Sequence, residues 1–161
     1  MEADQSLARD DVLTMLGACP ERVRDYVGGL DANRLGYRHA PAFPTLGELI
    51  LHVSDTGSAA DTVLRHALIE GAQEVDARSA LEPVGDGHDA TQPAQERLED
   101  LGRLRRRTMD LLRGLTAEDW DRVVIDPAVG EMTILDFCRL VAAHEMSHLS
   151  QVRNLMALLP E

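Results

Sequence analysis

The chain has 161 residues and a formal net charge of −12 at pH 7. This length suits a single domain with a core of its own, which we expect to span residues 1–161. The strong negative charge argues against binding to nucleic acid or to an anionic membrane surface. No apolar run approaches the ~18 residues that a membrane-spanning helix requires.

Aromatic residues form only 3% of the chain. A sandwich or barrel would draw more heavily on aromatic and β-branched residues, so the composition favours helices. The two cysteines, Cys19 and Cys138, are too few for a disulfide framework. The acidic segment 1–11 also lacks the basic and apolar regions of a signal peptide. We therefore expect an all-α protein in the cytoplasm.

The first predicted helix spans residues 7–30, where apolar side chains recur at near-helical spacing. Pro20 lies in the middle of this helix. A proline inside a helix removes one backbone hydrogen bond, so we expect a bend near Cys19. A pair of glycines weakens the end of the helix, and the glycine and prolines within residues 31–44 predict a loop.

The second predicted helix begins after Thr45, because Thr45 and Glu48 have the spacing of a capping box. Its apolar stripe continues to about Glu70, and Gly71 marks its expected end. His52 lies on the same inward-facing stripe. This helix therefore directs one histidine toward the expected core.

The segment 71–93 is rich in glycine, proline and aspartate, which predicts either a lid or a simple linker. A third helix follows over residues 94–113, with leucines on one face. This helix also carries four closely spaced arginines, Arg103, Arg105, Arg106 and Arg107. Because acidic residues are interleaved with them, we expect a solvated helix face rather than a nucleic-acid site.

A short capped helix is predicted over residues 116–120, and its tryptophan is expected to plug the end of the core. After a turn at residues 126–130, Thr133 and Asp136 have the spacing of a capping box for a last helix to about Leu159. No segment predicts a strand. Four long amphipathic helices and one short one close most simply into a four-helix bundle.

His144 and His148 lie one turn apart on the last helix, within its apolar stripe, so both side chains can meet at one point. Residues 144–148 also fit the H-E-x-x-H motif of zinc proteases. That motif needs a third ligand downstream, and the only downstream carboxylate is Glu161, at the end of the sequence. We therefore set the protease interpretation aside and expect Glu145 at the edge of the apolar stripe or exposed.

The third ligand of a metal site would come from another helix, and His52 is the histidine that lies on another core stripe. His39 and His88 fall in predicted loops, and His66 lies about four turns from His52. Three imidazoles with open positions are typical of a catalytic zinc-type site, although imidazole also suits nickel, iron and copper. Three buried histidines without a metal would each need a polar partner, at a cost of about 1–3 kcal/mol for each one that lacks it. A metal site is therefore the favoured interpretation.

Two polar residues follow the histidines at helical spacing. Gln151 lies three residues after His148 and Asp55 three after His52, so either side chain could orient an imidazole or simply face solvent. Cys138 points to another side of the last helix and is not an expected ligand. No motif identifies a protein nucleophile, so catalytic residues stay unassigned.

Three stretches of the sequence resemble the DinB-like (DinB/YfiT) superfamily: residues 51–55 (LHVSD), 130–136 (GEMTILD) and 143–151 (AHEMSHLSQ). The resemblance extends from the first helix to Leu158. Its motif is one histidine on the second helix followed by a His-x-x-x-His pair on the fourth. The resemblance implies a four-helix bundle in up-down-down-up order.

The same resemblance implies one divalent metal ion, most often zinc or nickel, with His52, His144 and His148 as its ligands. It also implies a homodimer and, in members with assigned activities, reactions of small thiols such as bacillithiol, mycothiol or glutathione. Pro44 departs from the family, whose members often have an aromatic residue at that position. The mouth of the site is therefore expected to differ here.

These observations lead to three hypotheses. The first is a metal-dependent thiol S-transferase of the bacillithiol/mycothiol type, whose partner is a small thiol substrate. The second is a non-catalytic, metal-binding dimeric bundle linked to the stress response. The third is a metal-dependent hydrolase that uses the same three histidines.

Overall fold

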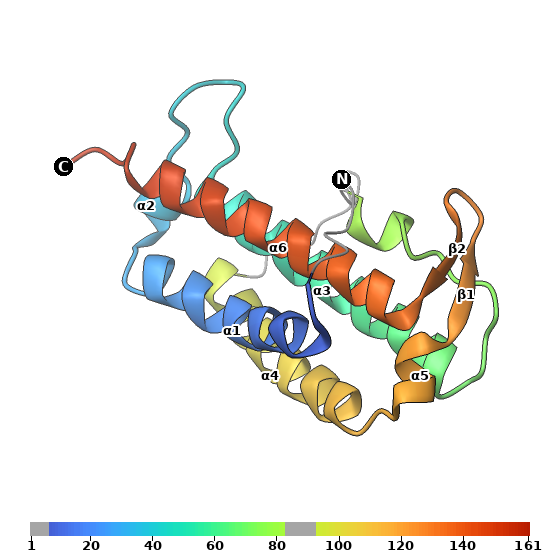
Figure 1. Cartoon of the computed structure of the whole chain (residues 1–161). Coiled ribbons are helices and arrows are strands. Elements are labelled where there is room, and N and C mark those ends of the chain that lie inside the picture. The colour runs from blue at the N-terminus through green and yellow to red at the C-terminus, as the bar shows by residue number, and fades with distance from the viewer. Residues whose placement is uncertain (1–6, 83–92) are drawn as a thin grey trace.

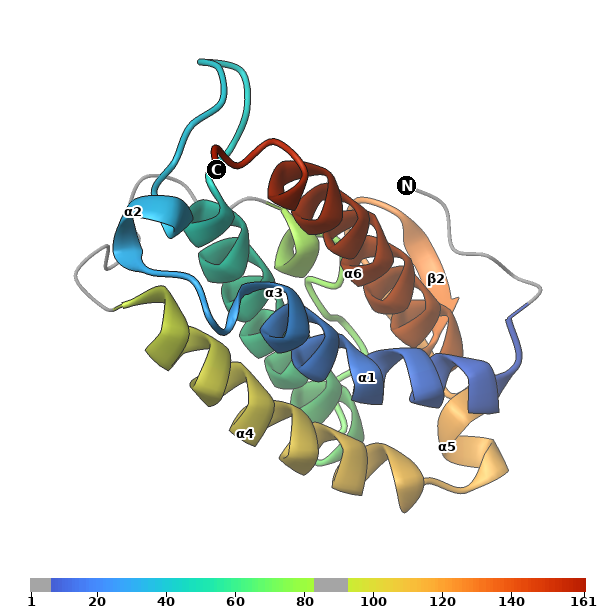
Figure 2. The same ribbon diagram turned by 90° about the vertical axis from the view of Figure 1, so that its left-hand side faces the viewer.

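The computed structural model describes residues 7–82 and 93–161. Four long helices pack side by side (Figures 1 and 2). They are α1 (Arg9–Val27), α3 (Leu46–Leu68), α4 (Ala94–Arg113) and α6 (Ile134–Met156). α1 and α6 run in one direction and α3 and α4 in the other, which is the expected up-down-down-up order. The long helices lie within a few residues of their predicted bounds.

The main contacts between the long helices form a square. α1 packs against α6 and α4, and α3 packs against the same two helices. Shorter elements join the long helices: α2 (Ala32–Leu35), the 3-10 helix η1 (Ser79–Leu81), α5 (Ala117–Asp121) and the strands β1 (Val123–Asp126) and β2 (Gly130–Thr133). No helix in the described part of the chain is both long and apolar enough to span a membrane.

Capping boxes set the starts of three helices, as their sequence spacing predicted. Thr45 Oγ1 accepts the backbone N–H of Glu48, and the Glu48 carboxylate accepts the N–H of Thr45. The same reciprocal pair begins α5 and α6. Because the first N–H groups of a helix have no partner within it, these side chains determine where each helix begins.

α1 continues through Pro20 to Val27. Proline has no N–H, so the carbonyl of Leu16, one turn earlier, loses its usual helical donor. The guanidinium of Arg105, from α4, replaces that donor: its Nη1 lies 2.6 Å from the Leu16 oxygen. A contact between two helices thus compensates the bond that Pro20 removes.

The prediction that the chain has no strand was wrong. β1 and β2 form an antiparallel hairpin whose register runs from Val123 opposite Thr133 to Asp126 opposite Gly130. Gly130 has a φ of 94°, which suits glycine at the end of this turn. Each strand has only four residues, too few for alternation to stand out from the helical pattern around it.

The segment after α3 packs on the bundle through residue 82. Glu74 forms a bridge with Ile125 of β1, and Val75, Ala77 and Ala80 are buried. The Asp126 carboxylate accepts the backbone N–H of Arg78 at 2.8 Å and so joins this segment to the hairpin. Residues 83–92, which belong to the predicted lid or linker and include His88, lie outside the described residues.

The buried apolar side chains form two clusters, one at each end of the bundle. Trp120 is buried in the cluster next to the hairpin, which confirms the predicted plug. Between the clusters, each of α3, α4 and α6 contributes buried polar residues: Ser54, Thr56, Asp61, Arg105, Thr108, His144 and Glu145. This polar layer lies beside the histidines that the sequence singles out.

Candidate metal centre

Three histidines meet between α3 and α6. These two helices lie side by side (Figure 1). His144 Nε2 lies 3.2 Å from His52 Nε2 and 3.0 Å from His148 Nε2. One ligand atom from each of the three imidazoles lies within 4.8 Å of the others. The pair on α6 meets because its members are one turn apart, whereas His52 is brought in from 92 residues away by helix packing.

Gln151 orients the imidazole of His148. The Nδ1 atom of His148 lies 2.6 Å from Gln151 Oε1, an acceptor, so Nδ1 carries the proton and donates it. The lone pair of Nε2 is then directed at the other two imidazoles. Burial lowers the pKa of His148, although the Gln151 bond and the charge of Glu145 oppose that shift. His148 therefore presents a neutral nitrogen at neutral pH.

His144 is the buried member of the cluster, with 6% of its surface exposed. Burial, followed by the neighbouring charges of His148 and His52, lowers the pKa of His144 to about 4. Its Nδ1 atom is buried and has no hydrogen-bond partner among the described residues. His144 is therefore neutral at pH 7, and hydrogen bonds alone do not satisfy its ring.

The donor set fits a divalent metal ion. With metal–nitrogen bonds of about 2.0–2.1 Å, two imidazole nitrogens of a tetrahedral site lie about 3.3 Å apart. The two Nε2–Nε2 distances of 3.0 and 3.2 Å are close to that value. Three imidazole ligands leave at least one position open, and imidazole suits zinc, nickel, iron and copper alike.

The expectation that Glu145 is exposed or at the edge of the stripe was wrong. Only 2% of Glu145 is exposed, and its carboxylate pairs with Arg105 through two hydrogen bonds, one of 2.9 Å from Nη1 to Oε2 and one from Nη2 to Oε1. α6 has α1 and α3 on its two sides and α4 across the bundle, so its buried arc is wider than an apolar stripe suggests. The sequence feature that could have predicted this burial is the position of Glu145 next to His144, on a helix that packs against both α1 and α3.

The prediction for Arg105 was also wrong. It was predicted on a solvated face, but only 5% of its surface is exposed. A charge this deep needs a partner, and Arg105 has both Glu145 and the carbonyl that Pro20 frees. Arg103, Arg106 and Arg107 are exposed, as predicted. Pro20 was the sequence feature that could have indicated this contact, because it leaves the Leu16 carbonyl without a helical donor and so requires a donor from elsewhere.

The remaining candidate residues lie outside the cluster of three. Asp55 forms an ion pair with Arg97 of α4. His66 is exposed and lies 2.7 Å from Glu70. His39 lies in the loop before α3, beside the rings of Tyr37 and Phe43.

Both cysteine side chains are buried in the apolar clusters. Burial raises the pKa of Cys138 to about 12. Burial and the charge of Glu145 likewise raise the pKa of Cys19 above its usual range. Both thiols are therefore protonated at neutral pH and poor nucleophiles.

Comparisons with known proteins agree with this architecture. Residues 15–152 match the model of the DinB superfamily. A solved structure of YfiT from Bacillus subtilis, described as a probable metal-dependent hydrolase with an unusual four-helix bundle topology, is similar in fold, with a TM-score of 0.79. The two are 18% identical, and the match covers 96% of this chain and 91% of YfiT. No curated protein matches this chain by sequence. With most of its length matched to the family model, the chain belongs to the DinB superfamily.

Proposed function

We propose that His52, His144 and His148 hold one divalent metal ion, zinc or nickel in the first instance, and that the protein is a metal-dependent enzyme. The observation that carries this proposal is the meeting of three imidazole nitrogens, one from each histidine. His148 donates its Nδ1–H to Gln151, so the lone pair of its Nε2 faces His144 Nε2 at 3.0 Å. A metal ion would make use of all three nitrogens.

The reaction class we favour is thiol S-transfer, with a low-molecular-weight thiol of the bacillithiol or mycothiol type as substrate. When bound, a divalent ion lowers the pKa of a thiol or of water at its open position. The substrate would supply the sulfur nucleophile, because Cys19 and Cys138 are buried and their pKa values are raised. In this proposal Gln151 orients His148, and the Arg105–Glu145 pair fixes the position of α6.

The first test is the metal content of untagged protein, measured by elemental mass spectrometry. We expect about one equivalent of metal in the wild type and none in His144→Ala. His66→Ala is the matched control, since His66 is an exposed histidine of α3. If the wild type holds no metal even after incubation with zinc and nickel, the three histidines are ordinary core residues and the enzyme hypothesis is refuted.

The second test separates thiol chemistry from the alternatives. A cobalt- or nickel-substituted protein should change its absorption spectrum when a small thiol is added, because thiolate ligation alters the ligand field. A screen of thiols with electrophilic acceptors should then reveal turnover that His148→Ala lacks. An unchanged spectrum would refute the thiol proposal, and metal binding without any turnover would favour the non-catalytic, stress-linked bundle.

A metal-dependent hydrolase is the second candidate function. It is favoured by the fold likeness to YfiT, which is described as a probable metal-dependent hydrolase. The test is hydrolysis of simple esters and amides by the metal-loaded protein, with His52→Ala as the comparison. Hydrolysis by a His52→Ala variant that binds no metal would refute this candidate.

Two further expectations belong to the same proposal. We expect a homodimer, which sedimentation equilibrium of the metal-loaded protein would test, and a cytoplasmic location. A monomer at all accessible concentrations would refute the first of these without affecting the metal site.

A further inference from the structure

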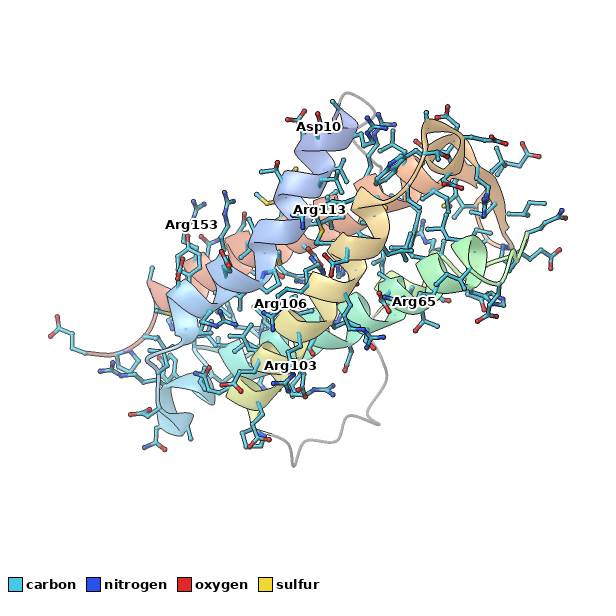
Figure 3. All side chains as sticks on the ribbon, turned by 90° about the horizontal axis from the view of Figure 1, so that it is seen from below. Asp10, Arg65, Arg103, Arg106, Arg113 and Arg153 are labelled. Carbon is cyan, nitrogen blue, oxygen red and sulfur yellow. The ribbon has the colours of Figure 1, made fainter. Side chains whose placement is uncertain are left out.

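A polar groove lies between α1 and α4, across the bundle from the α3–α6 interface that holds the histidines. Its volume is about 350 Å³. Two glycines help to open it, Gly17 on α1 and Gly102 on α4. Figure 3 shows α4 beside α1, with Arg106 and Arg113 labelled along α4. We call this cavity the α1–α4 groove.

Two guanidinium groups, one from each helix, lie over Gly102. A Cβ atom placed on Gly102 would lie 3.2 Å from Arg24 Nη2 and 3.9 Å from Arg106 Nη1. Arg113 lies seven residues after Arg106, about two turns further along the same face of α4, and lines the same groove. Three cationic side chains therefore share one concave surface of a protein whose net charge is −12.

These arginines have no counter-ion within residues 7–82 and 93–161. The side chains of Arg24, Arg106 and Arg113 form no ion pair or hydrogen bond there. The groove also contains Glu21 and Asp110, but neither carboxylate lies within 4.0 Å of an arginine nitrogen. Other arginines of the described chain do form ion pairs: Arg9, Arg38, Arg65, Arg97, Arg103, Arg105, Arg122 and Arg139. Arg22, Arg34, Arg78, Arg107 and Arg153 also form no ion pair in that part of the chain, but none of them lines the groove. What distinguishes the groove is that three unpaired arginines line one cavity.

Two converging guanidinium groups form a recognition site for an oxyanion. Each presents a planar fork of donors that matches the oxygens of a phosphate or carboxylate group. A phosphoryl dianion balances both charges, whereas a carboxylate balances only one. Glu21 and Asp110 repel an extended polyanion, but their carboxylates can accept hydrogen bonds from the hydroxyl groups of a small organic ligand. The net charge of −12 also opposes binding to an anionic membrane.

We propose that the α1–α4 groove binds the phosphoryl group of a small soluble phosphate, with Arg24 and Arg106 as its principal ligands. This site is separate from the histidine cluster and does not rest on the proposed function. Arg105, which forms part of the groove wall, stays paired with Glu145 and contributes to the shape of the groove.

The test is calorimetric titration of the full-length protein with inorganic phosphate and with ribose 5-phosphate, at constant ionic strength. Saturable binding is expected in both the metal-loaded and the chelator-treated protein. Arg24→Gln and Arg106→Gln should each weaken binding about tenfold or more, because each removes charge-assisted hydrogen bonds. Arg107→Gln is the matched control, since Arg107 is exposed on the same helix but does not line the groove.

Three outcomes would overturn the proposal. Binding that is equal in all three glutamine variants would show an adventitious ion only. Binding confined to the metal-loaded protein would place the phosphate at the histidines instead. Arg24-dependent binding to phosphatidic acid vesicles, without binding of the soluble phosphates, would assign the groove to a lipid headgroup.

A second variant fills the groove without removing an arginine. Gly102→Asp places a carboxylate beneath the guanidinium groups of Arg24 and Arg106. Aspartate has a higher helix propensity than glycine, so the substitution does not weaken α4 on that account. We expect this variant to remain folded and to lose phosphate binding. Gly102→Asn, which has the same size but no charge, should bind more tightly than Gly102→Asp. Unchanged binding in Gly102→Asp would refute this placement of the ligand.

Discussion

At the scale of single residues, the candidate site depends on the orientation of its imidazoles. Gln151 accepts the Nδ1–H of His148, which leaves Nε2 free to bind a metal. We predict that Gln151→Ala lowers metal affinity by about 10–100-fold, the usual effect of losing a group that orients a ligand. A competition titration against a chromophoric chelator measures this. Asn154→Ala, an exposed amide one turn further along α6, is the control.

Equal affinities in Gln151→Ala and the wild type would show that the His148 ring is held by packing alone. Gln151→Glu keeps an acceptor at the same position and should retain tight binding. A loss in Gln151→Glu as large as that in Gln151→Ala would contradict the role given to the hydrogen bond.

Asp126 gives a prediction on pH. Burial alone would raise its pKa, but hydrogen bonds from the backbone N–H groups of Arg78, Ala128 and Val129 outweigh that effect and lower it. A carboxyl group whose pKa is lower in the folded state contributes stability above its unfolded pKa, and that stability is lost as the pH falls below it. We expect Asp126→Asn to lower the free energy of unfolding by about 1–3 kcal/mol at pH 7.

The difference between Asp126→Asn and the wild type should shrink as the pH falls below 3.8, the ordinary pKa of the group. Urea denaturation at neutral and stepwise lower pH measures both values. A difference that is the same at every pH would show that the carboxylate charge contributes nothing and that only the shape of the side chain matters.

At the scale of helices, one chain of contacts joins α1, α4 and α6. The Leu16 carbonyl that Pro20 leaves unpaired accepts from Arg105, and Arg105 pairs with Glu145 beside His144. Removing one member of a buried pair leaves an uncompensated charge, which typically costs about 3–5 kcal/mol. We predict losses of this order for Arg105→Met and for Glu145→Leu, and a smaller loss in the double variant than the two added together.

Pro20→Ala supplies the matched test of this contact. Alanine restores an N–H for the Leu16 carbonyl, so it should recover part of the stability that Arg105→Met loses. Chemical denaturation of the four combinations gives the coupling energy. Strictly additive effects would show that Arg105 and Pro20 do not act through the Leu16 carbonyl.

At the scale of the whole molecule, the histidine cluster joins two helices that are distant in sequence. A ligand that binds only the folded chain stabilises it by about 2.7 kcal/mol when present at 100 times its dissociation constant. We therefore predict that zinc or nickel raises the thermal midpoint of the wild type in a concentration-dependent way. His52→Ala should show no such rise, whereas His66→Ala should match the wild type. A rise of equal size in His52→Ala would place the stabilising metal elsewhere.

The sequence by itself determined the features that depend on neighbouring residues. The capping boxes at Thr45 and Thr133 predicted where α3 and α6 begin, because their hydrogen bonds span only three residues. The spacing of His144 and His148 predicted one shared face, since a helix repeats every 3.6 residues. His52 was selected by its place on another apolar stripe. Periodicity and local hydrogen bonding explain each of these predictions.

Only the tertiary structure decided the features that depend on which helices become neighbours. Arg105 looks solvated within its own helix, and its burial follows from the acceptors that α1 and α6 bring to it. The hairpin forms because its buried residues, Val124 and Met132, pack against the bundle, and two four-residue strands carry too little pattern alone. The approach of His52 to His144, 92 residues away, likewise required the packing of α3 on α6. In each case the deciding contact joins residues that local spacing does not relate.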